Sequence, residues 1–347
     1  MGTPEFAVPS LQILLENGYE IPAVITAPDK PSGRGQKINY SAVKEFVLNY
    51  NIQNSYMNQN FNPIEILQPE KLKNPDFLNL LRSIKADLQI VVAFRMLPEL
   101  VWSMPNLGTF NLHASLLPQY RGAAPINWAI INGETISGIT TFYLNEEIDK
   151  GKSILQEQIP IGVEETAGEY HDRLKDAGAN LVLKTVQLIQ RKILNIDFNF
   201  DLSNIDSTIT QLEELVIGNQ PKTGPSLTPT FLHYAPKLEK NTGLIDWSKS
   251  TDSIFNLIRG LSPFPSAFTY LSGQTLKIYK ARPVTEAHKQ VEGTIYTDGK
   301  TQLQYFTKDG YLEIHDLQLE NKKRMKTGEL LRGLRLEPGF YLDKGED

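Results

Sequence analysis

The segment 111–118, Asn-Leu-His-Ala-Ser-Leu-Leu-Pro, places an amide and an imidazole two residues apart. It continues an alternation of polar and apolar side chains that begins at Thr109, and this two-residue period is typical of a β-strand. Asn111 and His113 should therefore project from the same face of that strand. Pro118 cannot donate a hydrogen bond to a sheet, so the strand must end before it. The pair is expected near the carboxyl end of a strand, where open α/β sheets bind ligands.

A carboxylate can join this pair from the loop that contains Asp149. Residues 138–144 set Ile139, Thr141 and Tyr143 on one face against Thr140, Phe142 and Leu144 on the other, which predicts a further strand, and Asp149 follows its end. Ser115 lies two residues from His113, but no Gly-x-Ser-x-Gly surrounds it, which disfavours a serine hydrolase. The candidate trio is therefore Asn111, His113 and Asp149.

An amide, an imidazole and a carboxylate together can transfer an acyl group to an amine without a covalent enzyme intermediate. Asn111 and His113 would donate hydrogen bonds to the carbonyl oxygen as it becomes negative. Asp149 would hold His113 in the right tautomer, favour its charged form and take the proton from the attacking nitrogen, directly or through water. Each such contact contributes a factor of about 10² to 10⁴ in rate. The alternative is that His113 is a hydrogen-bonded histidine of the core.

Other classes of site are disfavoured by the composition. The chain has no cysteine, which excludes disulfides and thiolate nucleophiles and fits a reducing compartment, and its five histidines are scattered without ligand spacing, so no metal site is expected. Residues 33–35, Gly-Arg-Gly, lack the strand-to-helix setting of a dinucleotide or phosphate loop, which disfavours a nicotinamide enzyme. No apolar run of about 18 residues and no signal peptide occurs, so a soluble cytoplasmic protein is expected.

The order of expected elements predicts two domains in the 347 residues. Strands alternate with helices over about 190 residues, which predicts an α/β domain with a doubly wound parallel sheet. Residues 51–62 are rich in Asn and Gln and suggest an extended loop or insertion. A capping box at Thr166 and Glu169 should start a long amphipathic helix. The expected helices are 5–17, 40–51, 74–84 and 125–132, and the expected strands are 21–27, 64–67, 88–93, 107–113, 138–144 and 153–159.

The remainder of the chain has a different pattern. Residues 195–235 are rich in Asn, Asp, Ser, Thr and Pro and predict a linker. A helix over 251–261 is followed by short strands with turn signals, at 275–281, 293–297, 302–307 and 311–317, which predicts a small β-barrel. The expected domains are therefore a catalytic domain over 1–194, the linker over 195–235 and a C-terminal domain over 236–347.

Basic residues gather at two places in a chain of net charge −5. Residues 28–37 carry two prolines, two glycines and four charges, which fits either a plain surface loop or a flexible basic arm that touches a polyanion. Residues 231–347 carry 17 Lys and Arg against 15 Asp and Glu, with a cluster at 322–326. This cluster is either solvated surface or a weak contact for a phosphate backbone.

The segment 111–118, together with Tyr-Arg-Gly at 120–122 and the later Asp149, resembles the hallmark of the folate-dependent formyltransferases. The trio alone identifies only the superfamily, which includes enzymes acting on glycinamide ribonucleotide, on amino sugars or on water. Four further segments resemble the branch that acts on initiator tRNA, and the resemblance covers nearly the whole chain. These segments are 1–7, 28–35, 121–126 and 245–247.

The resemblance implies a Rossmann-like formyltransferase domain followed by a barrel similar to an oligonucleotide-binding fold. It implies transfer of a formyl group from 10-formyltetrahydrofolate to the α-amine of methionyl initiator tRNA, for translation initiation, by a monomer without a metal or a membrane anchor. The implied catalytic residues are Asn111, His113 and Asp149. The implied formyl-folate contacts are Ser115, Leu116, Leu117, Pro118, Phe94, Arg95 and Met96. The implied tRNA contacts are Arg34, Lys37, Lys322, Lys323 and Arg324.

Three departures from the family pattern leave alternatives open. The family has a first strand before Met-Gly-Thr-Pro, whereas this chain begins there, so either the start is misassigned or the sheet lacks a central strand. Lys150 stands where the family usually has Thr, and its ammonium either approaches Asp149 or points into water. The segment 51–62 is longer than usual. The alternative functions are formylation of a small amine, hydrolysis of formyl-folate, and tRNA binding without catalysis.

Overall fold

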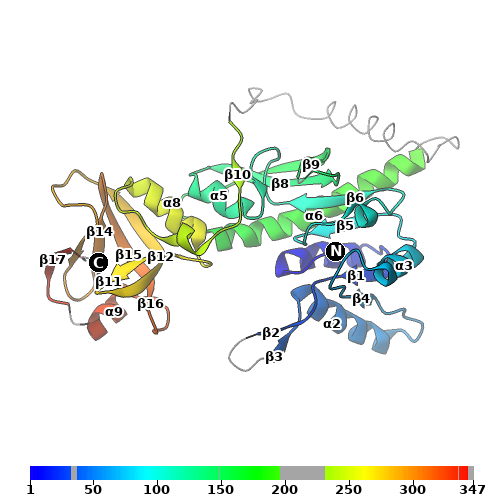
Figure 1. The fold of residues 1–347 in the computed structure, drawn as a ribbon, viewed down its shortest axis with the longest axis horizontal. Coiled ribbons are helices and arrows are strands. Elements are labelled where there is room, and N and C mark those ends of the chain that lie inside the picture. Colours follow the sequence, from blue (N-terminus) through cyan, green and yellow to red (C-terminus); the bar gives the residue numbers. More distant parts are fainter. Residues whose placement is uncertain (33–36, 148, 196–230, 335, 343–347) are drawn as a thin grey trace. The chain divides into compact units, whose positions relative to one another are not determined.

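The computed structural model describes residues 1–32, 37–147, 149–195, 231–334 and 336–342. Contacts between residues divide the chain into two compact units (Figure 1). The first consists of Met1–Gln119, Gly138–Ile159 and Asp172–Leu232, and the second of Tyr120–Ser137, Pro160–His171 and His233–Asp347. The predicted linker over 195–235 lies almost entirely outside the described residues, and the domain bounds at 194 and 236 stay a prediction.

The first unit contains a four-stranded sheet of order β5-β6-β8-β9 and a two-stranded parallel sheet of β1 and β4. The predicted α/β architecture is thus confirmed, and β5 and β6 are parallel neighbours. However, β8 runs antiparallel to β6, so the prediction of an all-parallel sheet is wrong there. An alternating pattern shows which residues share a face but not the direction in which a strand runs. The strands are β1 (Ala23–Ile25), β4 (Glu65–Leu67), β5 (Gln89–Val92), β6 (Thr109–His113), β8 (Ile136–Tyr143) and β9 (Ser153–Pro160).

Met1 and Gly2 lie between β1 and β5. The Gly2 amide donates to the Ile25 carbonyl (3.0 Å), and the Val92 amide donates to the Met1 carbonyl (2.9 Å). The Met1 amino group donates to the Ile90 carbonyl (2.6 Å), and burial lowers the pKa of this amino group to about 5. Apart from Met1 and Gly2, no strand lies between β1 and β5 in the described part of the chain.

The helices of the first unit mostly match the expected ranges, apart from α2. This helix runs from Ala42 to Met57, so the prediction of an extended loop from residue 51 is wrong for its first seven residues. The asparagines of this stretch are accommodated by side-chain hydrogen bonds: Asn51 exchanges two of 2.9 Å with the backbone of Ile64. The other elements are η1 (Glu5–Ala7), α1 (Val8–Glu16), α3 (Pro75–Ile84), α4 (Glu99–Trp102) and the part of α6 (Ala167–Asn195) that follows residue 171.

Residues 28–37 are only partly the expected loop, because β2 (Lys30–Ser32) and β3 (Lys37–Asn39) form a short antiparallel hairpin.

The long helix α6 packs closely on β6: a Cβ added to Gly178 would lie 2.7 Å from the Leu112 side chain. The predicted capping box starts this helix, since the Thr166 amide donates to the Glu169 carboxylate (2.9 Å) and the Glu169 amide donates to the Thr166 hydroxyl (3.3 Å). No helix within the described ranges is long and apolar enough to cross a membrane.

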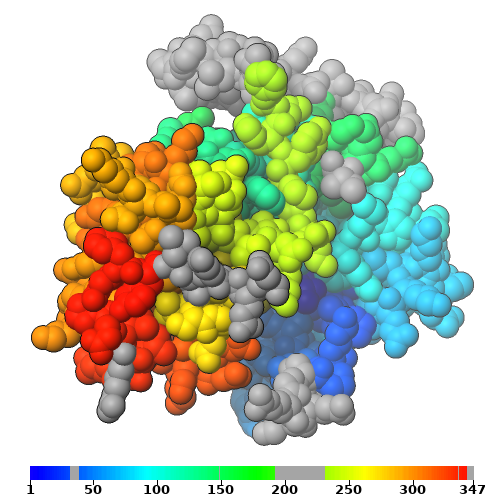
Figure 2. Space-filling view, turned by 60° about the vertical axis from the view of Figure 1, so that its left-hand side comes forward, coloured from blue at the N-terminus to red at the C-terminus, as the bar shows by residue number. Residues whose placement is uncertain are grey.

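The second unit is built on a curled antiparallel sheet of order β11-β12-β15-β14-β13-β17, with β16 paired to β15, so the expected barrel domain is present as a half-barrel. Its core is filled by apolar side chains of α8 and of the inner face of the sheet, among them Ile254, Ile258 and Leu276. Register shifts in β12 between residues 278 and 281 help the sheet to curl. In the space-filling view the last strands and α9, orange to red, lie together (Figure 2).

The remaining elements of this unit are short or belong to the sheet. The strands are β7 (Arg121–Gly122), β10 (Tyr234–Ala235), β11 (Ala267–Leu271), β12 (Gln274–Thr285), β13 (Thr294–Thr297), β14 (Leu303–Phe306), β15 (Gly310–Leu319), β16 (Met325–Lys326) and β17 (Gly339–Leu342). The helices are α5 (Pro125–Ile131), η2 (Lys240–Gly243), α8 (Thr251–Leu261) and α9 (Thr327–Leu334). The expected helices at 125–132 and 251–261 are confirmed.

Candidate active site

The candidate catalytic residues are carried by β6 and by the loop that follows β8. In the sheet register Asn111 lies opposite Val91 of β5 and Phe142 of β8, so it occupies the middle of the four-stranded sheet. His113 is the last residue of β6, and its Nδ1 lies 3.9 Å from Oδ2 of Asp149. The two side chains are 7% and 12% exposed, so the imidazole and the carboxylate face each other in a largely buried position.

Asn111 contributes a buried polar atom for which the described residues supply no hydrogen-bond partner. Its Oδ1 is shielded from solvent and has no hydrogen-bond partner within the described part of the chain. Such an atom costs free energy in the folded protein, because it has lost its bonds to water without replacement. A buried amide in this state, beside an imidazole paired with a carboxylate, fits a substrate that brings its own polar groups.

The loop that positions Asp149 has a constrained backbone. Asp149 adopts a φ of +51°, in the left-handed region that Asp tolerates better than most residues. A Cβ on Gly151 would lie 1.5 Å from the carbonyl oxygen of Tyr143, so only glycine fits there. The ammonium of Lys150 contacts the Glu147 carboxylate, which gives this unusual lysine a surface partner.

Gly151→Ala should lower kcat about a hundred-fold, since the added Cβ forces the Asp149 loop away from His113 and a shift of about 1 Å can cost that much. The neighbouring Lys150→Thr is the matched control. It removes a 48% exposed side chain that bonds to Glu147 and should leave kcat within about two-fold, because exposed ion pairs contribute little. Steady-state kinetics and thermal unfolding of both variants provide the measurement. Unchanged turnover in Gly151→Ala would show that the loop position is not needed.

Two side chains that the sequence alone does not mark form hydrogen bonds with the backbone of the predicted folate segment, residues 115–118. Thr140 donates through Oγ1 to the Ser115 carbonyl (2.7 Å) and accepts from the Leu117 amide (3.1 Å). Gln156 donates through Nε2 to the Leu117 carbonyl (2.7 Å). Ser115 and Leu117 are buried, Leu116 is half-buried and Pro118 is exposed after a cis peptide bond. Both supporting residues lie in predicted strands, but nothing in the sequence marked their partners.

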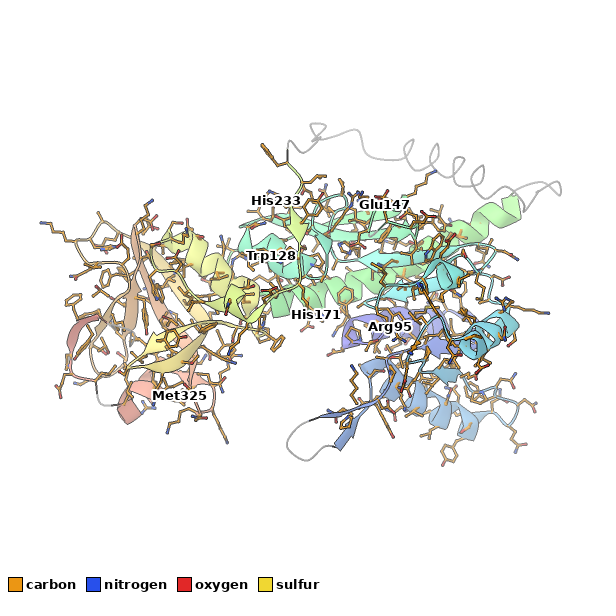
Figure 3. All side chains as sticks on the ribbon, in the orientation of Figure 1. Arg95, Trp128, Glu147, His171, His233 and Met325 are labelled. Atoms are coloured by element: carbon orange, nitrogen blue, oxygen red, sulfur yellow. The ribbon has the colours of Figure 1, made fainter. Side chains whose placement is uncertain are left out.

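The second predicted folate-contacting stretch, Phe94 to Met96, follows β5. Phe94 packs, partly buried, against the apolar cluster that contains Val91. Arg95, which Figure 3 labels, lies in the first unit. Its guanidinium lies beside the Phe94 ring, donates through Nη1 to the Glu70 carbonyl (2.9 Å) and contacts the Pro69 carbonyl. The Met96 side chain is 69% exposed and free of the core. The guanidinium thus ties the β5 loop to the loop after β4.

The predicted tRNA-contacting residues fall in both units. Arg34 lies outside the described residues, and Lys37 is paired with Ser32 across the hairpin. Lys322 and Lys323 are exposed. Arg324 donates through Nε and Nη2 to both oxygens of Asp316 (2.8 and 3.0 Å) and stacks over the Tyr279 ring. Asp316 Oδ2 also forms an ion pair with the Lys326 ammonium (3.2 Å), so part of the predicted basic cluster is neutralised by this one carboxylate.

No metal-binding group of three or more His, Asp or Glu side chains occurs among the described residues.

Comparison with known proteins identifies the class. Residues 1–186 match the family described as Formyl transferase, and residues 237–335 match Formyl transferase, C-terminal domain. The solved structure of WlaRD, a sugar 3N-formyl transferase, shares this fold with a TM-score of 0.55 and 21% identity, covering 93% of this chain and 97% of that one.

Curated relatives narrow the class further. The methionyl-tRNA formyltransferase of Bacteroides thetaiotaomicron is 47% identical over 348 residues, covering 99% of this chain and 97% of the relative. That of Flavobacterium johnsoniae is 47% identical, covering 96% and 95%. The chain therefore belongs to the formyl transferase family, and within it to the methionyl-tRNA formyltransferases.

Proposed function

We propose that this protein transfers the formyl group of 10-formyltetrahydrofolate to the α-amine of methionyl initiator tRNA, the step that prepares this tRNA for translation initiation. The observation that carries the proposal is the near-full-length similarity to methionyl-tRNA formyltransferases. The facing side chains of His113 and Asp149 at the end of β6, and the buried Asn111 oxygen that has no partner among the described residues, support it chemically.

The cosubstrate supplies an amide-bound formyl group, whose carbon an amine can attack. Asn111 and His113 donate hydrogen bonds to the formyl oxygen as negative charge develops on it, which is the role of an oxyanion hole. Asp149 orients the imidazole through Nδ1 and, directly or through water, takes the proton from the attacking nitrogen. The bond between the formyl carbon and N10 of the cosubstrate then breaks, and N10 takes up that proton as tetrahydrofolate leaves. The 3.9 Å between His113 and Asp149 is longer than a hydrogen bond, and catalytic contacts often tighten only when substrate binds.

Each proposed substrate has its own residues. Residues 115–118 and 94–96 form the formyl-folate contacts, the first of these held by Thr140 and Gln156. Arg34 and Lys37 in the first unit, and Lys322, Lys323 and Arg324 in the second, are the tRNA contacts. Residues 231–347 have a net charge of only +2, so the binding should be modest and sensitive to salt. The protein acts as a cytoplasmic monomer without a metal.

An assay with initiator Met-tRNA and 10-formyltetrahydrofolate tests the proposal. We expect formylated Met-tRNA to accumulate with one equivalent of tetrahydrofolate released, and free formate to stay at the level of a blank. Release of formate without transfer to tRNA would instead identify a formyl-folate hydrolase. Binding of tRNA without turnover would identify a tRNA-binding protein, and formylation of small amines alone a different transferase. Each of these three results contradicts the proposal.

A further inference from the structure

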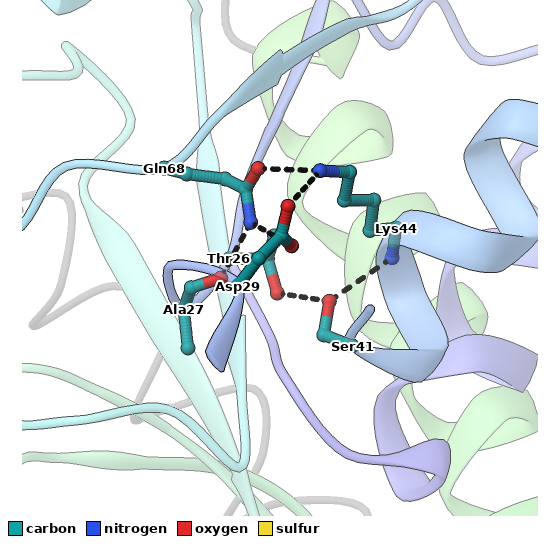
Figure 4. A network of polar contacts seen from close by, with 6 residues as sticks. All are labelled: Thr26, Ala27, Asp29, Ser41, Lys44 and Gln68. Carbon is teal, nitrogen blue, oxygen red and sulfur yellow. Dashed lines mark hydrogen bonds and ion pairs between the residues drawn. The ribbon is translucent and has the colours of Figure 1, made fainter. Parts of the chain in front are cut away.

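Lys44, near the start of α2, joins the two ends of the β2–β3 hairpin. Its ammonium bonds to Oδ2 of Asp29 (2.5 Å), the residue just before β2, and lies 4.2 Å from the ring centre of Tyr40, the residue just after β3. It also donates to Oε1 of Gln68 (2.8 Å), which follows β4 (Figure 4). One side chain thus touches the residues where the chain enters and leaves the hairpin.

Gln68, which follows β4, also holds the start of the hairpin. Its Nε2 donates to Oδ1 of Asp29 and to the carbonyl of Ala27, both at 2.8 Å, so the Asp29 carboxylate is held by both residues (Figure 4). Hydrogen bonds from Gln68 and Lys44 keep the pKa of the Asp29 carboxyl below its ordinary value. The carboxylate is therefore ionised near neutral pH, and its bond to the ammonium is charge-assisted.

The exit of the hairpin is fixed by the start of α2. Ser41 caps this helix by accepting from the Lys44 amide (3.1 Å), and its hydroxyl shares a hydrogen bond of 2.7 Å with Thr26, which follows β1 (Figure 4). The Lys44 and Asp29 side chains are only 15% and 25% exposed. A mostly buried lysine with two polar partners and an aromatic ring has one orientation, unlike a surface lysine.

We propose that Lys44 is a positioning residue for the tRNA acceptor: it fixes the direction of β2 and β3, the two strands that precede and follow Arg34 in the sequence. This inference rests on the proposed function, because the hairpin needs a defined direction only if it takes part in binding tRNA. Lys44 itself touches no substrate in this scheme. Its effect should therefore fall on tRNA and leave formyl-folate and the chemical step alone.

Lys44→Met keeps the length of the side chain and removes the charge. We expect the KM for Met-tRNA to rise about ten-fold, the size of effect that one charge-assisted hydrogen bond typically carries. The KM for 10-formyltetrahydrofolate and kcat should stay within about two-fold. Lys44→Arg, which restores a cation beside Asp29, should recover at least part of the tRNA affinity. Equal effects on both KM values, or none on tRNA, would overturn the proposal.

Lys175→Met is the matched control. Lys175 is similarly buried, with a side chain 16% exposed, and bonds to Glu5 (2.6 Å), but it lies on α6 and contacts neither end of the hairpin. It should leave the KM for Met-tRNA unchanged. A rise equal to that in Lys44→Met would mean that losing any buried lysine pair has this effect, and would refute the specific role.

A double-mutant cycle with Arg34→Ala tests whether the effect of Lys44 depends on Arg34. Once Arg34 is removed, Lys44→Met should raise the KM for Met-tRNA by less than about two-fold, because effects on one contact are not additive. Full additivity would overturn the proposal. Hydrogen exchange of residues 30–32 and 37–39 without tRNA gives a readout that does not depend on formylation. Faster exchange in Lys44→Met, but not in Lys175→Met, supports the role of Lys44 in holding the hairpin even if the proposed function fails. Unchanged exchange in Lys44→Met refutes that role.

Discussion

His113→Ala should lower kcat for formyl transfer by about 10³- to 10⁴-fold while the dissociation constant for Met-tRNA stays within about two-fold. The imidazole is 7% exposed and is fixed at the end of β6 against the Asp149 carboxylate, so it is placed to donate to one buried point. Removal of such a donor typically costs about 10² to 10³ in rate, and the loss of the imidazole that faces the Asp149 carboxylate adds to this, because Asp149 is the proposed proton acceptor. Only the transition state uses these contacts, so ground-state binding should be spared.

Single-turnover formylation with enzyme in excess provides the measurement, together with tRNA binding by filter retention or fluorescence. His113→Asn is the second variant, because it keeps a hydrogen-bond donor of smaller size and should retain more activity than alanine. Thermal unfolding shows whether either variant is misfolded. Turnover near that of the unmodified protein in His113→Ala would return His113 to the status of a core histidine.

The sequence predicted elements where the determining contacts are local. The shared face of Asn111 and His113 follows from strand alternation, and the start of α6 follows from Thr166 and Glu169, which lie three residues apart. The helix α2 was cut short in the prediction because the partner of Asn51 is Ile64, thirteen residues away. The direction of β8 was missed for a similar reason: periodicity is the same in parallel and antiparallel strands.

In the candidate site, too, features that depend on the residues themselves were predicted, and features that depend on distant contacts were not. The types and order of Asn111, His113 and Asp149 were sufficient to suggest acyl transfer, because their chemistry belongs to the side chains. The supports of the site join segments far apart in the chain: Gln156 reaches Leu117 across 39 residues, and Gln68 reaches Asp29 across the same span. A single sequence contains no signal for such pairs, so these residues emerge only when the chain is folded.

Asn111→Leu should separate stability from activity. We expect kcat to fall about 10²- to 10³-fold, because the variant loses an amide beside the reacting oxygen. The free energy of unfolding should rise by about 1 kcal/mol or more, because leaving a buried acceptor unsatisfied costs about 1–3 kcal/mol and leucine has nearly the shape of asparagine. Kinetics and denaturant unfolding without substrate provide the two readouts.

The opposite signs of the change in kcat and of the change in the free energy of unfolding distinguish a catalytic group from a structural one. A side chain that serves the fold loses stability when it is replaced, whereas one kept for a substrate leaves an unsatisfied atom in the free protein and gains stability when that atom is removed. Asn111→Ala is the control for shape, because it also removes the amide but leaves a cavity, so it should be as inactive as Asn111→Leu without being more stable. A destabilised Asn111→Leu would mean that the Oδ1 atom has a partner in the folded protein, and that the asparagine is held for structure.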